Sequence, residues 1–238
     1  MRIGPDCKVV VLTGAGISAE SGIKTFRASD GLWEEHRIED VATPYAWQKD
    51  PQLVWSFYQK RRIQLLEVEP NPAHRALKVL EQHLGENFLL ITQNVDDLHE
   101  RAESENVIHM HGELRKLRCE GCGEVFDMMD KASLTEEFVE CPSCGNSRLR
   151  PHIVWFHEMP LMMPAIYEAV ENCDFFITIG TSGHVTPAAD LIHVAKSCKA
   201  TCVGINLEQP LNYDVHDIFH QGKAGEILPQ LVEQWLSS

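Results

Sequence analysis

Short runs of apolar, largely β-branched residues recur along the chain, and each run ends at a glycine or in a polar loop. Polar residues do not alternate with the apolar ones, as they do in a strand that has one face in water. The pattern therefore predicts strands buried on both faces, as in a parallel sheet. These predicted strands cover residues 9–12, 88–92, 107–110, 175–179 and 202–205.

Apolar residues at helical spacing fill the segments between these runs. Strands that alternate with helices predict an α/β fold with a doubly wound parallel sheet. Every predicted helix except the last begins with proline, which suits the first position of a helix. The predicted helices cover residues 51–66, 72–84, 164–170, 187–197 and 225–236.

Two segments interrupt this alternation and predict a second, smaller domain made from two insertions. Residues 26–66 show no strand pattern and indicate a loop followed by a helix, whereas residues 115–150 are polar and rich in cysteine. We predict a large domain of residues 1–26, 67–114 and 152–238. The small domain then combines a helical insertion, residues 27–66, with a zinc ribbon, residues 115–151.

The charge balance limits the partners that the chain can have. Its 238 residues include 21 Lys+Arg against 35 Asp+Glu, a formal net charge of −14. A surface this acidic repels phosphate backbones, so nucleic-acid binding is disfavoured and a lysine-rich protein segment is favoured. The sequence shows neither an apolar run long enough to span a membrane nor a signal-peptide pattern. We expect no membrane partner and a location in the reducing cytoplasm.

Four of the eight cysteines form two Cys-x-x-Cys pairs, Cys119 with Cys122 and Cys141 with Cys144. In a reducing compartment this spacing indicates a closed, four-thiolate zinc site. Such a site has no open coordination position, so we interpret the zinc as structural, stabilising a segment too poor in apolar residues to fold alone. A nucleic-acid-binding zinc ribbon is the alternative, and the net charge argues against it.

A glycine-rich turn, Gly14-Ala15-Gly16, directly follows the first predicted strand and fits the dinucleotide-binding pattern. Its glycines allow a close approach to a pyrophosphate, and a helix beginning there would offer free amides. Taken alone the motif is weak, because any glycine-rich strand–helix turn resembles it. No second strand with a ribose-binding acid follows, which disfavours an ordinary dehydrogenase.

Polar residues also stand at the ends of later strands, where α/β sheets bind their ligands. Gln93, Asn94 and Asp96 can hold a ribose and an amide, although Asn94 or Asp96 fits helix capping equally well. The segment His109-Met110-His111-Gly112 offers a general base, but spacing does not select one of the twelve histidines. Residues 179–183 and 204–208 also follow strands and could line the same crevice.

Taken in order, these motifs resemble the sirtuin family of NAD-dependent protein-lysine deacylases. The matching segments are GAGIS with TFRASDGLW, TQNVD, HMHG, both Cys-x-x-Cys pairs, RPHIVWF, GTSG, INLE and GKAGE. The resemblance implies a Rossmann-like NAD-binding domain and acylated lysine side chains of proteins as substrates. It implies that NAD contacts Gly14, Ala15, Gly16, Ser18, Phe26, Arg27, Trp33, Gln93, Asn94, Asp96, Gly180, Thr181, Ser182, Asn206, Glu208 and Ala224.

The resemblance also implies the catalytic residues, His111 and Asn94. In the family's reaction the acyl oxygen of the lysine amide captures the ribose carbon that nicotinamide leaves. His111 as base would then deprotonate a ribose hydroxyl, which attacks the resulting imidate. The products are free lysine, nicotinamide and O-acyl-ADP-ribose.

A further match, to the bacterial class III sirtuins, bears on the acyl group. Tyr58 and Arg61 match the Tyr-x-x-Arg of that class, and a spacing of three places them on one helix face. A guanidinium beside a phenol can bind a terminal carboxylate, so we expect succinyl- or malonyl-lysine to be preferred and acetyl-lysine to be accepted. An ordinary amphipathic face is the alternative. The other expected substrate contacts are Ala42, Val154 and Phe156.

Two departures from the family pattern affect the peptide-binding segments. His157 stands where glycine is usual, so we expect its side chain either to block the approach of the substrate peptide's backbone or to hold an unfavourable φ. The second departure is Thr186, which replaces a tyrosine. The alternatives to a deacylase are a protein that binds NAD, ADP-ribose or an acylated peptide with little turnover, and a mono-ADP-ribosyltransferase.

Overall fold

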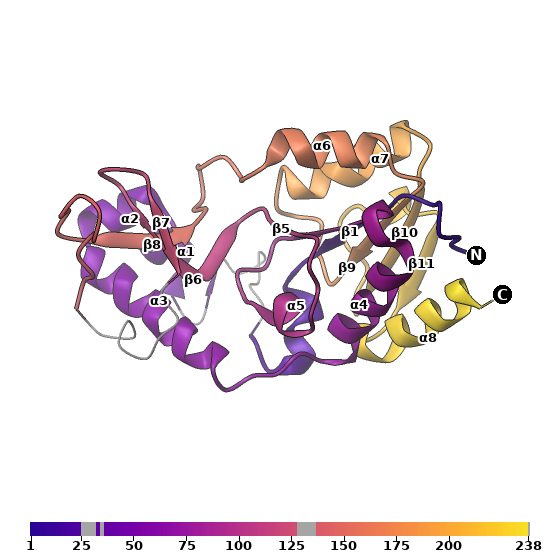
Figure 1. The fold of residues 1–238 in the computed structure, drawn as a ribbon, viewed down its shortest axis with the longest axis horizontal. Coiled ribbons are helices and arrows are strands. Elements are labelled where there is room, and N and C mark those ends of the chain that lie inside the picture. Colours follow the sequence, from indigo (N-terminus) through magenta and orange to yellow (C-terminus); the bar gives the residue numbers. More distant parts are fainter. Residues whose placement is uncertain (25–31, 34–35, 128–136, 238) are drawn as a thin grey trace.

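The computed structural model describes residues 1–24, 32–33, 36–127 and 137–237. Within them, six parallel strands form one sheet in the order β11-β10-β9-β1-β4-β5 (Figure 1). The chain starts at β1, runs to one edge and then crosses to the other side of β1, a switch point where α/β sheets bind ligands. The strands are β1 (Val9–Thr13), β4 (Phe88–Thr92), β5 (Val107–His109), β9 (Phe175–Ile179), β10 (Thr201–Asn206) and β11 (Ile218–Gln221).

The predicted doubly wound α/β sheet is confirmed, and each predicted strand lies within two residues of an observed one. Sequence reasoning missed β11, which pairs with β10 at the edge of the sheet. Its residues Ile-Phe-His-Gln are only half-buried, apart from the exposed last one, so they form no continuous apolar run. The first strand illustrates the burial on both faces: Val9 and Val11 point into one apolar cluster, Val10 and Leu12 into another.

Helices cover both faces of the sheet. α4 (Pro72–Leu84) and α8 (Ala224–Leu236) pack on one face, and α6 (Met163–Glu171) and α7 (Leu191–Ser197) on the other. The helix predicted from residue 187 begins as the 3-10 turn η5 (Ala188–Asp190) before it becomes α7. The Ile3 amide donates to the Trp235 carbonyl, 3.1 Å away, so the chain ends lie side by side.

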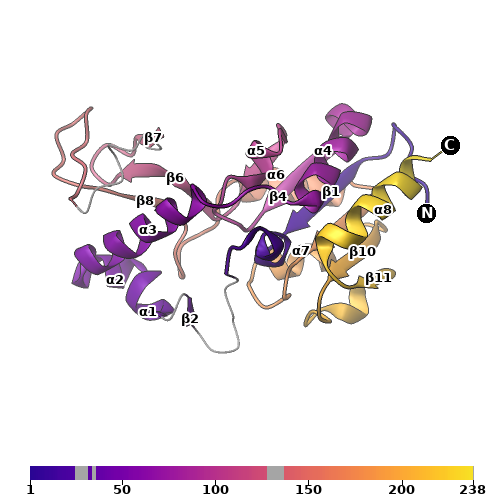
Figure 2. The same ribbon diagram turned by 90° about the horizontal axis from the view of Figure 1, so that it is seen from below.

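A second group of elements lies beside the sheet (Figure 2). As far as the described residues show, it combines three helices with a small antiparallel sheet of order β7-β6-β8, and one cluster of buried side chains joins residues 41–68 to residues 114–155. The elements are β2 (Leu32–Trp33), β3 (His36–Arg37), α1 (Ile38–Val41), α2 (Pro44–Lys49), α3 (Pro51–Leu65), β6 (Gly112–Cys119), β7 (Val125–Asp127) and β8 (Leu149–Ile153).

The antiparallel sheet was not predicted, and β6 shows why. Its buried positions, Leu114, Leu117 and Cys119, lose their alternation at a register shift between Gly112 and Leu117. The short hairpin of β2 and β3 likewise lies where no strand was expected. The residue ranges assigned to the two domains stay a prediction. Among the described residues, no helix combines the length and the apolar character that a membrane crossing requires.

Candidate active site

The glycine turn after β1 packs directly against the loop that follows β9. Gly14 donates its amide to the Ile179 carbonyl at 2.9 Å, and Gly16 donates to the Gly180 carbonyl at 2.8 Å. A Cβ atom on Gly14 would lie 2.7 Å from the Gly180 oxygen, and one on Gly16 would lie 2.7 Å from the Gly180 Cα. The two glycines are therefore required by this close contact between loops.

Within the described residues no α-helix directly follows this turn: the chain continues as two 3-10 helices, η1 (Ala15–Ile17) and η2 (Ala19–Ser21). The helix N-terminus predicted here is therefore that of a short 3-10 helix. Ser18 lies between the two, and its hydroxyl donates to Asp96 Oδ2 at 3.0 Å and accepts from Asn94 Nδ2 at 3.1 Å. The turn thus positions Ser18 against the loop that follows β4.

Of the two interpretations that the sequence left open for Asp96, the structure shows the contact with the start of a helix. Its Oδ1 accepts from the Leu98 amide, 3.2 Å away, at the start of α5 (Leu98–Arg101), while its other oxygen binds Ser18. Burial raises the pKa of Asp96 to about 6, although both hydrogen bonds oppose the shift. Asn94, in contrast, points its side chain at Ser18 and caps no helix.

Several of the predicted NAD contacts meet around Thr181. Gln93 Nε2 donates to the Thr181 hydroxyl at 3.1 Å, and Asn206 Nδ2 donates to the Thr181 carbonyl at 3.1 Å and to the Glu208 carbonyl at 2.9 Å. The neighbouring Ser182 accepts from the Leu211 amide through its carbonyl. Ala224, at the first position of α8, is buried. Sequence reasoning missed Glu20, whose carboxylate accepts from the Gly225 amide at 2.7 Å.

His111 has the protonation state that a general base requires. Its Nδ1 lies 3.1 Å from the Gln93 carbonyl. Because a carbonyl only accepts, Nδ1 carries the ring proton and Nε2 presents a lone pair. Burial lowers the pKa of His111, and the hydrogen bond to Gln93 only partly offsets that effect. The ring is therefore neutral near pH 7.

Two buried histidines that sequence reasoning missed lie behind this group. His74 Nδ1 accepts from the Asn71 amide at 3.3 Å, so its Nε2 donates to the Ser18 hydroxyl, 3.5 Å away. His99 Nε2 lies 3.1 Å from the Thr13 hydroxyl, and the His74 and His99 rings are 4.9 Å apart. Burial lowers the pKa of His74 to about 4. A histidine at a core-facing helix position is the signal that could have identified them.

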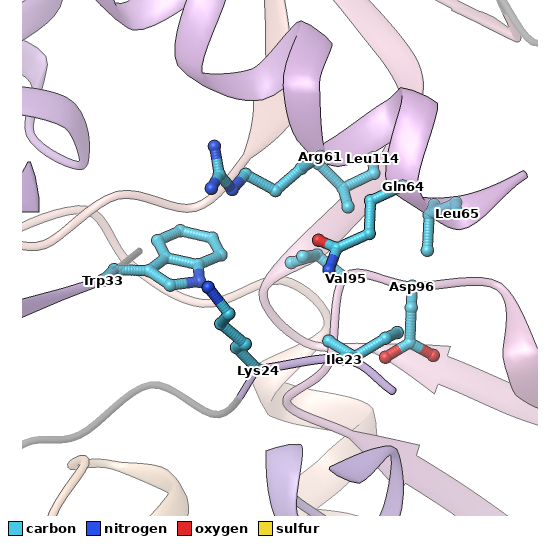
Figure 3. Close-up of a pocket in the computed structure, with 9 residues that line it drawn as sticks. All are labelled: Ile23, Lys24, Trp33, Arg61, Gln64, Leu65, Val95, Asp96 and Leu114. Carbon is cyan, nitrogen blue, oxygen red and sulfur yellow. The ribbon is translucent and has the colours of Figure 1, made fainter. Parts of the chain in front are cut away.

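A pocket lies beside Asp96, with apolar walls and two cations (Figure 3). Arg61 donates from Nη1 to the Phe57 carbonyl at 3.0 Å, and its guanidinium lies 4.1 Å from the centre of the Phe57 ring. Figure 3 shows Lys24 and Arg61 both extending toward Trp33. The lining residues are Ile23, Lys24, Trp33, Arg61, Gln64, Leu65, Val95, Asp96 and Leu114.

Tyr58 lies behind this pocket and does not line it. Its side chain is fully buried, its hydroxyl accepts from Trp155 Nε1 at 3.0 Å, and its ring packs edge-on against Trp33 at 5.9 Å. The structure therefore places Arg61 and Trp33 in the pocket without Tyr58. The predicted NAD contacts Phe26 and Arg27 lie outside the described residues.

Backbone hydrogen bonds tie the predicted substrate contacts in place: Val154 is bound to His111, and Phe156 is bound to Ala42. The Val154 amide donates to the His111 carbonyl at 2.9 Å, and the Phe156 amide donates to the Ala42 carbonyl at 2.9 Å. Ala42 is buried, whereas Phe156 is exposed. The next residue, His157, is exposed and has φ +73°, which confirms the expected unfavourable φ.

We expect His157→Gly to raise the melting temperature by up to roughly 4 °C. A left-handed conformation costs a residue with a Cβ about 1 kcal/mol, which glycine avoids, and such a gain shifts a chain of this size by a few degrees. Calorimetry on His157→Gly and His157→Ala measures the effect, because alanine keeps the Cβ. Equal melting temperatures for the two variants would contradict the strain.

The four predicted zinc ligands converge. Cys119 and Cys144 have their sulfurs 3.5 Å apart, Cys122 and Cys141 have theirs 3.7 Å apart, and all four lie within 4.8 Å of one another. A tetrahedral ion with zinc–sulfur bonds of about 2.3 Å requires sulfurs roughly 3.8 Å apart. The donor set and its dimensions therefore fit zinc.

Comparisons with known proteins agree with this geometry. The Sir2 family model matches residues 14–187. An NAD-dependent protein deacylase of Yersinia pseudotuberculosis is 54% identical over 233 residues, 97% of this chain and 83% of the relative. A solved Sir2 homologue–NAD complex superposes with a TM-score of 0.88 at 42% identity, covering 97% of this chain and 90% of the other.

A second solved structure, a Sir2 homologue variant in complex with 2'-O-acetyl-ADP-ribose, superposes with a TM-score of 0.87 at 43% identity and covers 97% of this chain and 93% of the other. The relative and the two solved structures each cover 97% of this chain, and the family model covers most of the motifs. The chain therefore belongs to the Sir2 family, the sirtuins.

Proposed function

We propose that this protein removes acyl groups from lysine side chains of other proteins and consumes NAD as co-substrate. The observation that carries the proposal is the His111 imidazole, neutral and with its Nε2 lone pair available, hydrogen-bonded to the loop that holds Asn94 and Asp96. The names of the relatives, NAD-dependent protein deacylase, support the same activity. Gln93 and Thr181, hydrogen-bonded to each other in the loops after β4 and β9, lie where α/β sheets bind dinucleotides.

NAD supplies the ADP-ribosyl group that accepts the acyl group as nicotinamide departs. The chain's own residues contribute in two ways: they orient the reacting groups, and they move a proton. Asn94, Asp96 and Ser18 hold one another in a fixed arrangement beside the pocket. His111 Nε2 accepts the proton of the hydroxyl that attacks, while Nδ1 stays bound to the Gln93 carbonyl.

Release of nicotinamide tests the proposal. Mixing the protein with NAD and a succinylated or acetylated peptide is expected to yield nicotinamide, free lysine and O-acyl-ADP-ribose in equal amounts. A protein that only binds NAD or an acylated peptide releases none of them. A mono-ADP-ribosyltransferase instead adds the mass of ADP-ribose to a protein and leaves the acyl group in place.

The preferred acyl groups are the dicarboxylic ones, succinyl and malonyl, and acetyl is also accepted. Ile23, Val95 and Leu114 offer apolar contact to methylene groups. Arg61 and Lys24 provide positive charge in the same pocket for the distal carboxylate. The role of Tyr58 beside Arg61 stays a prediction, because its hydroxyl faces Trp155.

We expect Arg61→Met to lower kcat/KM for succinyl-lysine peptides by about 10- to 100-fold, as the loss of a hydrogen bond to a charged group implies. Deacetylation should fall far less, because an acetyl group has no distal carboxylate. Lys24→Met should have a smaller effect, since its side chain is exposed to water. Equal losses on the two substrates would contradict the carboxylate-binding role of Arg61.

Zinc has a structural role in this proposal, since four thiolates leave no site for substrate. We also propose a cytoplasmic location. The four-cysteine metal site supports this location, because Cys-x-x-Cys pairs stay reduced and bind zinc in a reducing compartment.

A further inference from the structure

The two histidines of the His-Met-His segment hold consecutive carbonyl groups of the loop after β4. His111 Nδ1 lies 3.1 Å from the Gln93 carbonyl, and His109 Nδ1 lies 3.2 Å from the Asn94 carbonyl. Both rings therefore reach the same loop, one from the last residue of β5 and the other from the turn that follows β5. His109 differs from His111 in having a second partner: its Nε2 lies 2.6 Å from Glu100 Oε1, on α5.

The partners of His109 determine its charge. The Asn94 carbonyl only accepts hydrogen bonds, and so does an ionised carboxylate. The Glu100 side chain is 40% exposed and is therefore ionised near neutral pH, whereas the His109 side chain is only 8% exposed. Both ring nitrogens must then donate, which makes His109 an imidazolium paired with Glu100, while His111 is neutral.

We infer that His109 is a positioning residue, held as an imidazolium by Glu100, that fixes the Asn94 backbone beside the reaction site. The inference rests on the proposed deacylase function and extends it to a residue that touches neither substrate. Asn94 is then held at both ends: its carbonyl by His109 and its side chain by the Ser18 hydroxyl. Loss of the second proton on His109 would remove one of its two hydrogen bonds and loosen the loop.

The electrostatic surroundings support this assignment. Burial alone would lower the pKa of His109, but the hydrogen bond and charge of Glu100 raise it above the ordinary value. The other charged or titratable groups around the pair are Glu113 and Lys116 on β6, 2.7 Å apart, Asp96 in the loop and the neutral His99 on α5. The negative charge of Glu113 adds to that of Glu100.

The test is the pH profile of kcat/KM for the parent protein and its Glu100→Gln variant. The Gln amide carries no charge, so the second proton on His109 is held less tightly, and a neutral His109 ring then binds the Asn94 carbonyl through an uncharged, weaker hydrogen bond. We expect near-parental activity at about pH 6 and a roughly 10-fold loss at about pH 8.5, because misplacing a catalytic group is costly. His109→Gln should lose activity at both pH values.

Glu105→Gln is the matched control, since it neutralises an exposed carboxylate that pairs with Lys78, 3.2 Å away, and should keep the parental profile. A loss in Glu100→Gln that is equal at all pH values would indicate a merely structural role and overturn the inference. An inactive parent at every pH would instead contradict the proposed function.

Nitrogen NMR of the histidine rings decides the charge of His109 without any turnover. The signal that disappears in His109→Gln should show two protonated nitrogens at pH 7, and the His111 signal only one. A neutral His109 ring at pH 7 would overturn the inference whether or not the protein is active.

Discussion

Replacing His111 by asparagine should lower the rate of deacylation by about 10²- to 10⁴-fold, the usual contribution of a general base. The asparagine amide can still donate to the Gln93 carbonyl, so the loop keeps its partner. Asparagine has no basic nitrogen, however, and therefore cannot take the proton from the hydroxyl. The loss should be the same for acetyl and succinyl peptides, because His111 acts on the reacting atoms and not on the acyl chain.

Steady-state kinetics on both peptides measures this loss, and thermal unfolding checks that the variant folds. His193→Asn is the matched control, since His193 is an exposed residue of α7. Nicotinamide exchange into NAD should survive in His111→Asn, because the base is needed only after nicotinamide leaves. Retention of full deacylation would remove His111 from its assigned role.

The pH dependence of the parent gives a second check on the same residue. The neutral ring is the active form, so activity rises as pH increases through the pKa of His111. Burial lowers that pKa, which places the midpoint of the acid limb below the ordinary value of 6.5. A midpoint above 6.5 would show that His111 is not the group that accepts the proton.

The sheet could be predicted because its strands are buried on both faces, and such strands leave continuous apolar runs. Strands β11 and β6 were not predicted, and each was missed for a different reason. β11 is a half-buried edge strand, and β6 loses its alternation at a register shift. Both depend on pairing with distant residues, which a local pattern does not contain.

The site shows the same division between local and distant information. Ordered motifs located Gln93, Asn94, Asp96 and the four cysteines, which the structure brings to the loop after β4, against Ser18 and Thr181, and to one metal site. Which of His109 and His111 is neutral depends on Glu100, nine residues before His109 and on another element. Lys24 and His74 belong to no motif, so only the structure shows that Lys24 lines the pocket and that His74 lies against Ser18.

Removal of zinc should have the largest effect on stability. Structural zinc binds zinc-finger peptides with roughly 10–16 kcal/mol, and that free energy is coupled to folding. Cys119 and Cys141 are buried in the same apolar cluster as Trp47, Trp55 and Trp155. We therefore expect a chelator, or Cys141→Ser, to lower the melting temperature by at least about 10 °C. Tryptophan fluorescence reports the change, and elemental analysis should find one zinc per chain in the parent.

The same cluster contains Phe57 and Tyr58 of the helix that presents Arg61, so loss of zinc should abolish activity on all acyl groups together. Loss of zinc thereby differs from Arg61→Met, which should lower the activity on succinyl-lysine far more than the activity on acetyl-lysine. Cys198→Ser, at an exposed thiol outside the metal site, should change neither stability nor activity. Cobalt in place of zinc should restore both and show the absorption of a tetrahedral thiolate site. Because a closed site does not touch the reacting atoms, kcat should be the same with either metal; a kcat that followed the metal would show that the ion takes part in catalysis.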